Sequence, residues 1–244
     1  MTSELVNHLQ KIHEYEKTDF RWCNLRKIVK LSIVGEKILD AGCGTGHLTL
    51  ELLRDNYDVT AIDYSDELVD FAQKTITDAQ YPAHVFSCDL IKIKDKNLPL
   101  FDSIVCLDVI EHIENDNIAL KNLYDLLKRK GTLIISVPAV KKIYGQRDKK
   151  IGHFRRYDKN ELIDELENVG FVISTIRYWN FIGILPFVLF EKVLHKPINE
   201  TVRYSRTSLY SKMIHPVLNL WFSVVENNIH FPIGLTLVVV CKKD

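Results

Sequence analysis

The feature that most constrains the fold of this chain is the stretch Lys37–Gly46, which reads Lys-Ile-Leu-Asp-Ala-Gly-Cys-Gly-Thr-Gly. An apolar run ends at Asp40, glycines alternate at three positions, and an amphipathic segment begins directly afterwards. This order predicts a buried strand, a tight turn and a helix. Because glycine tolerates positive φ and lets another molecule lie close to the backbone, the alternation indicates a ligand packed on the turn.

A second acidic residue favours a ligand of nucleoside size. Asp63 closes the apolar run Val59–Ile62, 17 residues after Gly46. At the end of a neighbouring parallel strand, its carboxylate is placed to accept both ribose hydroxyls of a nucleoside lying over the glycines. Asp89 follows a third apolar run, where it is either in reach of an adenine amino group or the cap of a loop.

The glycine spacing separates two families of nucleotide-binding proteins. Gly42-x-Gly44-x-Gly46, preceded by Asp40, differs from the dinucleotide fingerprint Gly-x-Gly-x-x-Gly. It resembles motif I of the class I S-adenosylmethionine-dependent methyltransferases, and the resemblance covers about residues 36–171 and the C-terminal strand. This implies S-adenosyl-L-methionine as the cofactor. The expected cofactor contacts are Asp40, Gly42, Cys43, Gly44, Gly46, Asp63, Tyr64, Asp89, Leu90 and Leu107.

Strands and helices alternate along the chain, which predicts a doubly wound α/β fold. The resemblance implies a Rossmann-like, seven-stranded and mostly parallel sheet with an antiparallel last strand. We expect a single methyltransferase domain over 1–244, with an N-terminal helical cap over 1–34 and a helical insertion over 180–231. In the cap, Tyr15, Trp22 and Arg26 are candidates to reach the cleft. Other expected elements are helices over 65–78, 116–130 and 158–170, the last with a capping box of Asp158 and Glu161, and strands over 83–87, 101–107, 132–137, 171–178 and 234–241.

Composition limits the partners and the compartment. Lys plus Arg and Asp plus Glu both number 32, so no overall charge attracts nucleic acid, which we do not expect as a partner. The five cysteines are scattered without metal-type pairing, which fits a reducing cytoplasm. No charge-free run reaches the roughly 18 residues of a spanning helix. We therefore expect a cytoplasmic protein, with peripheral membrane contact or homodimer formation through 180–231.

The turn after the apolar run 101–107 carries the candidate catalytic groups. Methyl transfer from a sulfonium is an in-line displacement, and the cofactor supplies the electrophile. A hydroxyl acceptor also needs a base to remove its proton, for which histidine is the usual choice. His112 is the first candidate and His153 the second, while the alternative is a structural role for both.

A metal site is the alternative reading of the same turn. The array Asp108-x-x-Glu111-His112, with His153 downstream, resembles the acidic cluster of quinone-biosynthesis O-methyltransferases and of small-RNA 3′-end 2′-O-methyltransferases, which is thought to bind Mg²⁺. Asp108 replaces the more usual Glu at the first position. Without a metal, His112 is a base or part of the pocket wall.

The region 141–160 differs from the rest of the chain, with eight Lys or Arg against two Asp. Arg155, Arg156 and Tyr157 are expected to bind substrate there. The insertion is apolar, so the predicted acceptor is a small or lipid-linked molecule with an apolar body and an anionic or polyhydroxylated head. The sequence thus predicts a methyltransferase acting on a hydroxyl. The alternatives are a Mg²⁺-assisted RNA 2′-O-methyltransferase, a nucleotide-dependent oxidoreductase and a non-catalytic nucleotide-sensing module.

Overall fold

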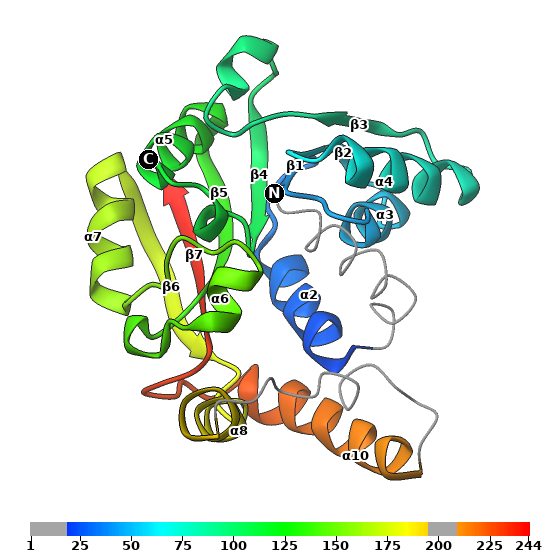
Figure 1. Cartoon of the computed structure of the whole chain (residues 1–244). Helices are drawn as coiled ribbons and strands as arrows, with labels where there is room; N and C mark the ends of the chain where they lie inside the picture. The colour runs from blue at the N-terminus through cyan, green and yellow to red at the C-terminus, as the bar shows by residue number, and fades with distance from the viewer. Residues whose placement is uncertain (1–18, 195–208) are drawn as a thin grey trace.

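The computed structural model describes residues 19–194 and 209–244, and its centre is a seven-stranded sheet in the order β3-β2-β1-β4-β5-β7-β6 (Figure 1). Strands β1 to β5 pair in parallel, whereas β7 is antiparallel to both of its neighbours. The predicted fold class is confirmed. The strands are β1 Lys37–Ala41, β2 Asp58–Asp63, β3 His84–Ser87, β4 Phe101–Leu107, β5 Leu127–Pro138, β6 Phe171–Trp179 and β7 Thr236–Lys243.

Helices cover both faces of the sheet (Figure 1). The helices outside the insertion are α2 Phe20–Ser32, α3 His47–Arg54, α4 Asp66–Asp78, α5 Asp116–Leu126, α6 Gln146–Lys150 and α7 Lys159–Val169, with single 3₁₀ turns at Ile93–Lys96, Ile110–His112 and Lys141–Ile143.

Residues of β4 alternate between the two faces of the sheet. Ile104 and Cys106 pack with α5 and α7 on one face, whereas Val105 and Leu107 pack with α2 and α3 on the other. This alternation follows from the two-residue period of a strand, and it explains why β4 is apolar from Ile104 to Leu107.

The insertion between β6 and β7 is helical where it is described. It contains α8 Ile184–Phe187 followed by a π-helical segment Val188–Val193, then α10 Leu209–Leu220 followed by a second π-helical segment Trp221–Glu226. Phe222 is buried between Phe20 of α2 and Trp179 at the end of β6, with ring centroids 5.2 and 4.8 Å away. The insertion therefore contributes to the core.

Parts of two predicted segments lie outside the described residues: 1–18 of the N-terminal cap and 195–208 of the insertion. Among residues 19–194 and 209–244, no helix combines the length and hydropathy that a membrane crossing requires.

Two local predictions are wrong. The helix expected to reach residue 130 ends at Leu126, because Leu127 is fully buried and pairs with Phe101 as the start of β5. The predicted capping box at the start of α7 is also absent. Asp158 instead accepts a hydrogen bond from the backbone N–H of Lys141, and Glu161 forms an ion pair with the side chain of Lys141. Contacts with a segment distant in sequence thus replace the local cap.

Candidate active site

The glycine turn lies between β1 and α3, at the carboxyl end of the sheet. Gly42, Gly44 and Gly46 have φ values of +93°, +53° and +80°. A Cβ at Gly42 would lie 2.2 Å from Cγ2 of Val109, whereas a Cβ at Gly44 would meet nothing within 4 Å. Gly42 is therefore required by close packing, and Gly44 leaves its backbone open to a ligand.

Two carboxylates hold this turn in place. The Asp63 carboxylate accepts hydrogen bonds from the backbone N–H groups of Gly44 and Ser65, both at 3.0 Å. The Asp40 carboxylate accepts one from the hydroxyl of Thr49 at 2.6 Å. Burial raises the pKa of Asp40 to about 6 and also raises the pKa of Asp63. A cationic ligand would relieve this cost, because it favours the ionised carboxylates.

A cavity of about 720 Å³ opens over the glycine turn, within the size range of ligand pockets. Nine of the ten predicted cofactor contacts line it: Asp40, Gly42, Cys43, Gly44, Asp63, Tyr64, Asp89, Leu90 and Leu107. Gly46 does not. It precedes α3 and its Cα faces Ala72 of α4, where a Cβ would come within 2.9 Å. Its role is therefore helix packing, while contact of the other nine with a cofactor stays a prediction.

Helix α2 forms part of the cavity wall. Trp22 and Arg26 line the cavity as expected, and Arg21 lies beside them. Arg26 also pairs with Glu51 of α3 at 3.3 Å. The third candidate from the cap, Tyr15, lies outside the described residues.

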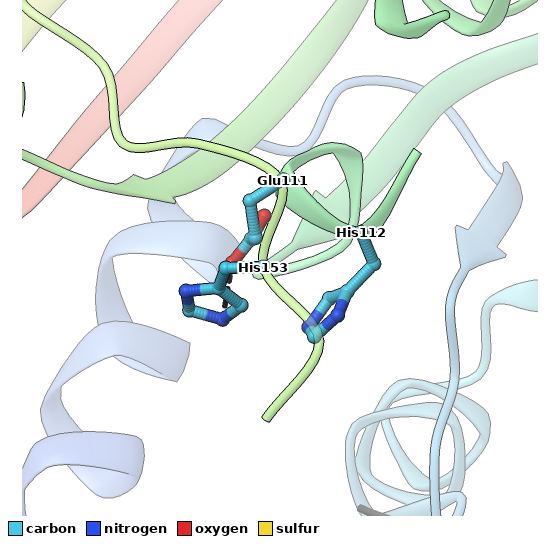
Figure 2. Close-up of side chains that lie close together, drawn as sticks. All are labelled: Glu111, His112 and His153. Atoms are coloured by element: carbon cyan, nitrogen blue, oxygen red, sulfur yellow. Dashed lines mark ion pairs between the residues drawn. The ribbon is translucent and has the colours of Figure 1, made fainter. Parts of the chain in front are cut away.

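The turn after β4 carries Glu111, whose carboxylate points toward His153 (Figure 2). Glu111 is fully buried, and neither of its carboxylate oxygens accepts a hydrogen bond from any residue in 19–194 or 209–244. Burial, followed by the charge of Asp108, raises its pKa well above the ordinary value. A group in this state needs either a proton or a cation, because an isolated buried charge is costly.

Two histidines stand beside Glu111 (Figure 2), and candidate ligand atoms of the three residues lie within 4.8 Å of one another. Nε2 of His153 is 3.8 Å from Oε1 of Glu111, and the rings of His112 and His153 are 4.6 Å apart. Burial, and then the neighbouring His153, lower the pKa of His112 to about 4. His112 is therefore neutral at pH 7. Its Nδ1 lies 3.2 Å from the Gly152 carbonyl oxygen, which can only accept, so Nδ1 carries the hydrogen and Nε2 the lone pair.

Asp108 does not belong to this cluster, although it lines the cavity. Its Oδ1 accepts a hydrogen bond from the hydroxyl of Ser136 at 2.8 Å, and its φ of +54° turns the backbone away from a regular strand. The cluster therefore differs from the predicted metal-binding set, since Glu111, His112 and His153 come together without Asp108.

The predicted substrate-binding residues are held by internal partners. Tyr157 is fully buried and donates its hydroxyl hydrogen to Asp116 at 2.7 Å, so its prediction as a substrate contact is wrong. Arg155 also pairs with Asp116, and it does not line the cavity. Arg156 does line the cavity, but it is 4% exposed and pairs with Asp148 at 2.8 Å.

Several other residues that line the cavity were not predicted from the sequence. Arg147, Asn180 and Phe187 line it, and Phe187 comes from α8 of the insertion. Asp148, behind the cavity, joins the histidine cluster through His153. Its only signal in the sequence was its position as one of two acids in a basic region.

A family profile described as "Methyltransferase domain" matches residues 13–176. The chain belongs to this methyltransferase family. The matched range contains the glycine turn, both carboxylates and the histidine cluster, so the predicted membership in the class I methyltransferases is confirmed.

Curated relatives of this methyltransferase include two proteins named ubiquinone biosynthesis O-methyltransferase. The one from Coxiella burnetii is 32% identical over 107 residues, which are 44% of this chain and 45% of the relative. The one from Rickettsia bellii is 28% identical over 211 residues, 72% of this chain and 86% of the relative. The match thus spans less than half of the length of the Coxiella protein.

Solved structures show the same fold. A SAM-dependent methyltransferase from Archaeoglobus fulgidus superposes with a TM-score of 0.57 at 19% identity, over 93% of this chain and 97% of the other. Magnesium protoporphyrin IX methyltransferase from Synechocystis, with bound S-adenosylhomocysteine, superposes with a TM-score of 0.55 at 17% identity, over 98% and 84%. At these identities the likeness concerns the fold.

Two alanine substitutions in the methyltransferase's glycine turn should have different effects. Gly42→Ala should destabilise the fold by about 2–5 kcal/mol, since positive φ costs roughly 1–2 kcal/mol and overpacking against Val109 roughly 1–3. Gly44→Ala should cost only the roughly 1–2 kcal/mol of the positive φ, because its Cβ would contact no other residue. It should weaken binding of S-adenosylhomocysteine, because the Cβ would occupy the space in which we expect the ligand to lie. Urea unfolding and calorimetric titration measure the two effects. Unchanged affinity in Gly44→Ala would contradict the placement of the cofactor on this turn.

Proposed function

We propose that this methyltransferase transfers the methyl group of S-adenosyl-L-methionine to a hydroxyl oxygen, at the Glu111–His112–His153 cluster. The new bond joins the methyl carbon to the acceptor oxygen, the carbon–sulfur bond breaks, and S-adenosylhomocysteine leaves as the neutral thioether. The acceptor's hydroxyl proton must go to a base. The observation that carries the proposal is a buried carboxylate without hydrogen-bond donors beside two imidazoles, in the wall of the same cavity as the glycine turn.

The cluster fits a divalent cation better than it fits a histidine base alone. A conjugate-acid pKa of about 4 makes His112 a weak base but leaves it neutral, as a metal ligand must be. Glu111 would supply the carboxylate, and His112 and His153 the imidazoles. A bound cation would act as a Lewis acid that lowers the pKa of an acceptor hydroxyl.

The ligand types favour certain metals. Mg²⁺ prefers oxygen ligands and keeps several waters, whereas two imidazoles and one carboxylate suit Mn²⁺, Fe²⁺, Co²⁺ or Zn²⁺. The Mg²⁺ of the sequence prediction is therefore the less favoured ion for this set of residues. Asp108, which would add a second carboxylate, is bonded to Ser136.

The proposed acceptor is a hydroxylated aromatic ring with an apolar substituent. The residues that line the cavity include the apolar side chains of Trp22, Phe154, Phe187 and Leu235. The curated relatives are named ubiquinone biosynthesis O-methyltransferases, and this adds support because a prenylated quinone precursor has such a shape. RNA is the less favoured acceptor, since the chain has no net charge.

Glu111→Gln should test the metal site directly. Its amide keeps the size of the side chain but removes the charge, so we expect Mn²⁺ binding, measured by electron paramagnetic resonance with S-adenosylhomocysteine present, to weaken at least tenfold. Methylation of 3,4-dihydroxybenzoate, with or without a farnesyl chain, should stop in EDTA and return with Mn²⁺. Glu67→Gln, an exposed change on α4, is the matched control. Activity that survives both EDTA and Glu111→Gln would exclude the metal and leave His112 as the base.

The insertion presents exposed apolar side chains that would suit a lipid-linked acceptor. Leu185, Leu189 and Val193 recur at four-residue intervals and are 47–81% exposed, while Met213, Val217, Leu220 and Val224 are 55–76% exposed. We propose that this surface rests on a lipid bilayer from which the acceptor is taken. Removal of the whole insertion is unsuited as a test, because Phe187 and Phe222 belong to the core.

The double variant Leu185→Ser/Leu189→Ser should co-sediment with phospholipid vesicles at least tenfold less than the wild type, since burying each leucine contributes roughly 1.5–3 kcal/mol. Ile118→Ser, which changes an apolar residue on α5 that is about as exposed as Leu189, is the control. If the double variant converts a dimer to a monomer in analytical ultracentrifugation without any change in vesicle binding, the surface is a subunit interface.

A further inference from the structure

Asp148 is the residue behind the histidine cluster. It lies on α6, is 1% exposed, and does not line the main cavity. Its Oδ1 is 3.1 Å from Nδ1 of His153, and its backbone oxygen accepts a hydrogen bond from the His153 N–H at 2.8 Å. Both the side chain and the backbone of His153 are therefore held by the same residue.

This contact determines which nitrogen of His153 carries the hydrogen. An ionised carboxylate can only accept, so Nδ1 must donate, and the lone pair then lies on Nε2. Nε2 is the atom that lies 3.8 Å from Oε1 of Glu111. The imidazole of His153 thus presents its acceptor nitrogen to the cluster, as a metal ligand or proton acceptor requires.

Asp148 itself is tightly fixed and kept ionised. Its Oδ1 also accepts hydrogen bonds from Nε and Nη2 of Arg156, both at 2.8 Å, and its Oδ2 accepts one from the N–H of Gly145 at 2.9 Å. Burial by itself would raise the pKa of Asp148, but the bonds from His153 and Arg156 outweigh it and hold the pKa at about 2. The Arg156 guanidinium lies over the ring of Phe187, 4.7 Å from its centroid, so α8 supports the assembly.

We propose that Asp148 is the positioning residue for His153: it holds the imidazole in the Nδ1-protonated tautomer with Nε2 facing Glu111. The importance of this role for catalysis rests on the proposed function of the cluster. The assignment of the tautomer is independent of that function, because it follows from the contact between Asp148 and His153. A carboxylate that orients a metal-binding histidine in this way typically changes metal affinity by 10- to 100-fold.

Asparagine at position 148 cannot reproduce these contacts. Its amide N–H₂ must replace one of the two oxygens. In the Oδ1 position it would face Nε and Nη2 of Arg156 as well as Nδ1 of His153, so the amide should occupy the Oδ2 position, where it faces the N–H of Gly145. The remaining carbonyl oxygen is neutral, and it is therefore a weaker acceptor for the Nδ1 hydrogen of His153 than the carboxylate is. Asp148→Asn should therefore disturb the imidazole with little change in side-chain volume.

Nitrogen-15 NMR of the metal-free, full-length protein with labelled histidine tests the tautomer. We expect the His153 signal, assigned by its loss in His153→Gln, to be more than 90% Nδ1-protonated in the wild type, and the Nε2-protonated fraction to be larger in Asp148→Asn. Tyr144→Phe is the matched control, since it removes only the hydrogen bond to the His153 backbone oxygen. A wild-type His153 that is mainly Nε2-protonated would overturn the proposal, and this spectrum decides the matter even if Asp148→Asn does not fold.

Metal affinity provides the second measurement. Titration with Co²⁺, followed through its visible absorption in the presence of S-adenosylhomocysteine, should show binding that is 10- to 100-fold weaker in Asp148→Asn and unchanged in Tyr144→Phe. Equal affinity in Asp148→Asn with an unchanged tautomer would refute the positioning role. If the wild type binds no Co²⁺, the proposed metal site fails, whereas the NMR result still decides the role of Asp148.

Discussion

His112→Ala is expected to lower turnover by about 100- to 10,000-fold, with little change in the dissociation constant of S-adenosylhomocysteine. His112 lies in the cavity wall, and its Nδ1 donates a hydrogen bond to the Gly152 carbonyl oxygen. Its Nε2 therefore carries the lone pair that can bind a metal or accept a proton. Loss of this nitrogen removes either a metal ligand or the acceptor of the hydroxyl proton. The measurement is the initial rate with radiolabelled S-adenosyl-L-methionine and a farnesylated 3,4-dihydroxybenzoate, beside a calorimetric titration with S-adenosylhomocysteine.

His230→Ala, at an exposed histidine in the loop before β7, is the matched control and should behave as the wild type. Full activity in His112→Ala would make the histidine a structural residue. We expect His112→Ala to keep near-native circular dichroism and a near-native melting temperature. If the variant instead loses both activity and cofactor binding, together with these signs of a native fold, the substitution disturbs the glycine turn.

Asp63→Ala should weaken binding of S-adenosylhomocysteine by about two orders of magnitude or more. The carboxylate is proposed to accept two ribose hydroxyl bonds of roughly 1.5–3 kcal/mol each, and every 1.4 kcal/mol is tenfold in affinity. The contacts of Asp63 add a second reason, because it also holds the N–H of Gly44, the residue whose backbone is open to the ligand. Asp63→Asn keeps a hydrogen-bond acceptor without the charge, so its affinity for S-adenosylhomocysteine should lie between those of the wild type and Asp63→Ala.

Asp58→Ala provides the control on the same strand. Asp58 is exposed and pairs with Lys37 at 3.7 Å, a surface contact that contributes little. Calorimetry on the three variants and the wild type should therefore rank Asp58→Ala with the wild type. An unchanged dissociation constant in Asp63→Ala would remove the ribose assignment, although the chain would remain a member of the methyltransferase family.

Much of the fold was predictable from short-range patterns. Alternating apolar runs and helical segments indicated the doubly wound sheet, and residues with strong local preferences marked several ends correctly. Ser65 caps α4 through its hydroxyl, and Gly170 ends α7 with a φ of +113°. Such features depend on a few neighbouring residues, so the sequence encodes them directly. The end of α5 did not follow this rule, because burial of Leu127 beside Phe101 outweighed the local preference for helix.

The candidate site also contains residues that the sequence predicted and residues that it did not. The residues at the ends of β1, β2 and β4 were predictable, since parallel strands bring their carboxyl ends to one edge of the sheet. What the sequence determined is therefore the class of enzyme and most of the residues that line the cavity over the glycine turn. The tertiary structure alone decided the composition of the cluster, because Glu111 and His153 are 42 positions apart and meet where the N–H of Phe154 bonds to the Glu111 carbonyl. It also turned Tyr157 inward to Asp116, since a buried carboxylate needs donors that no local pattern specifies.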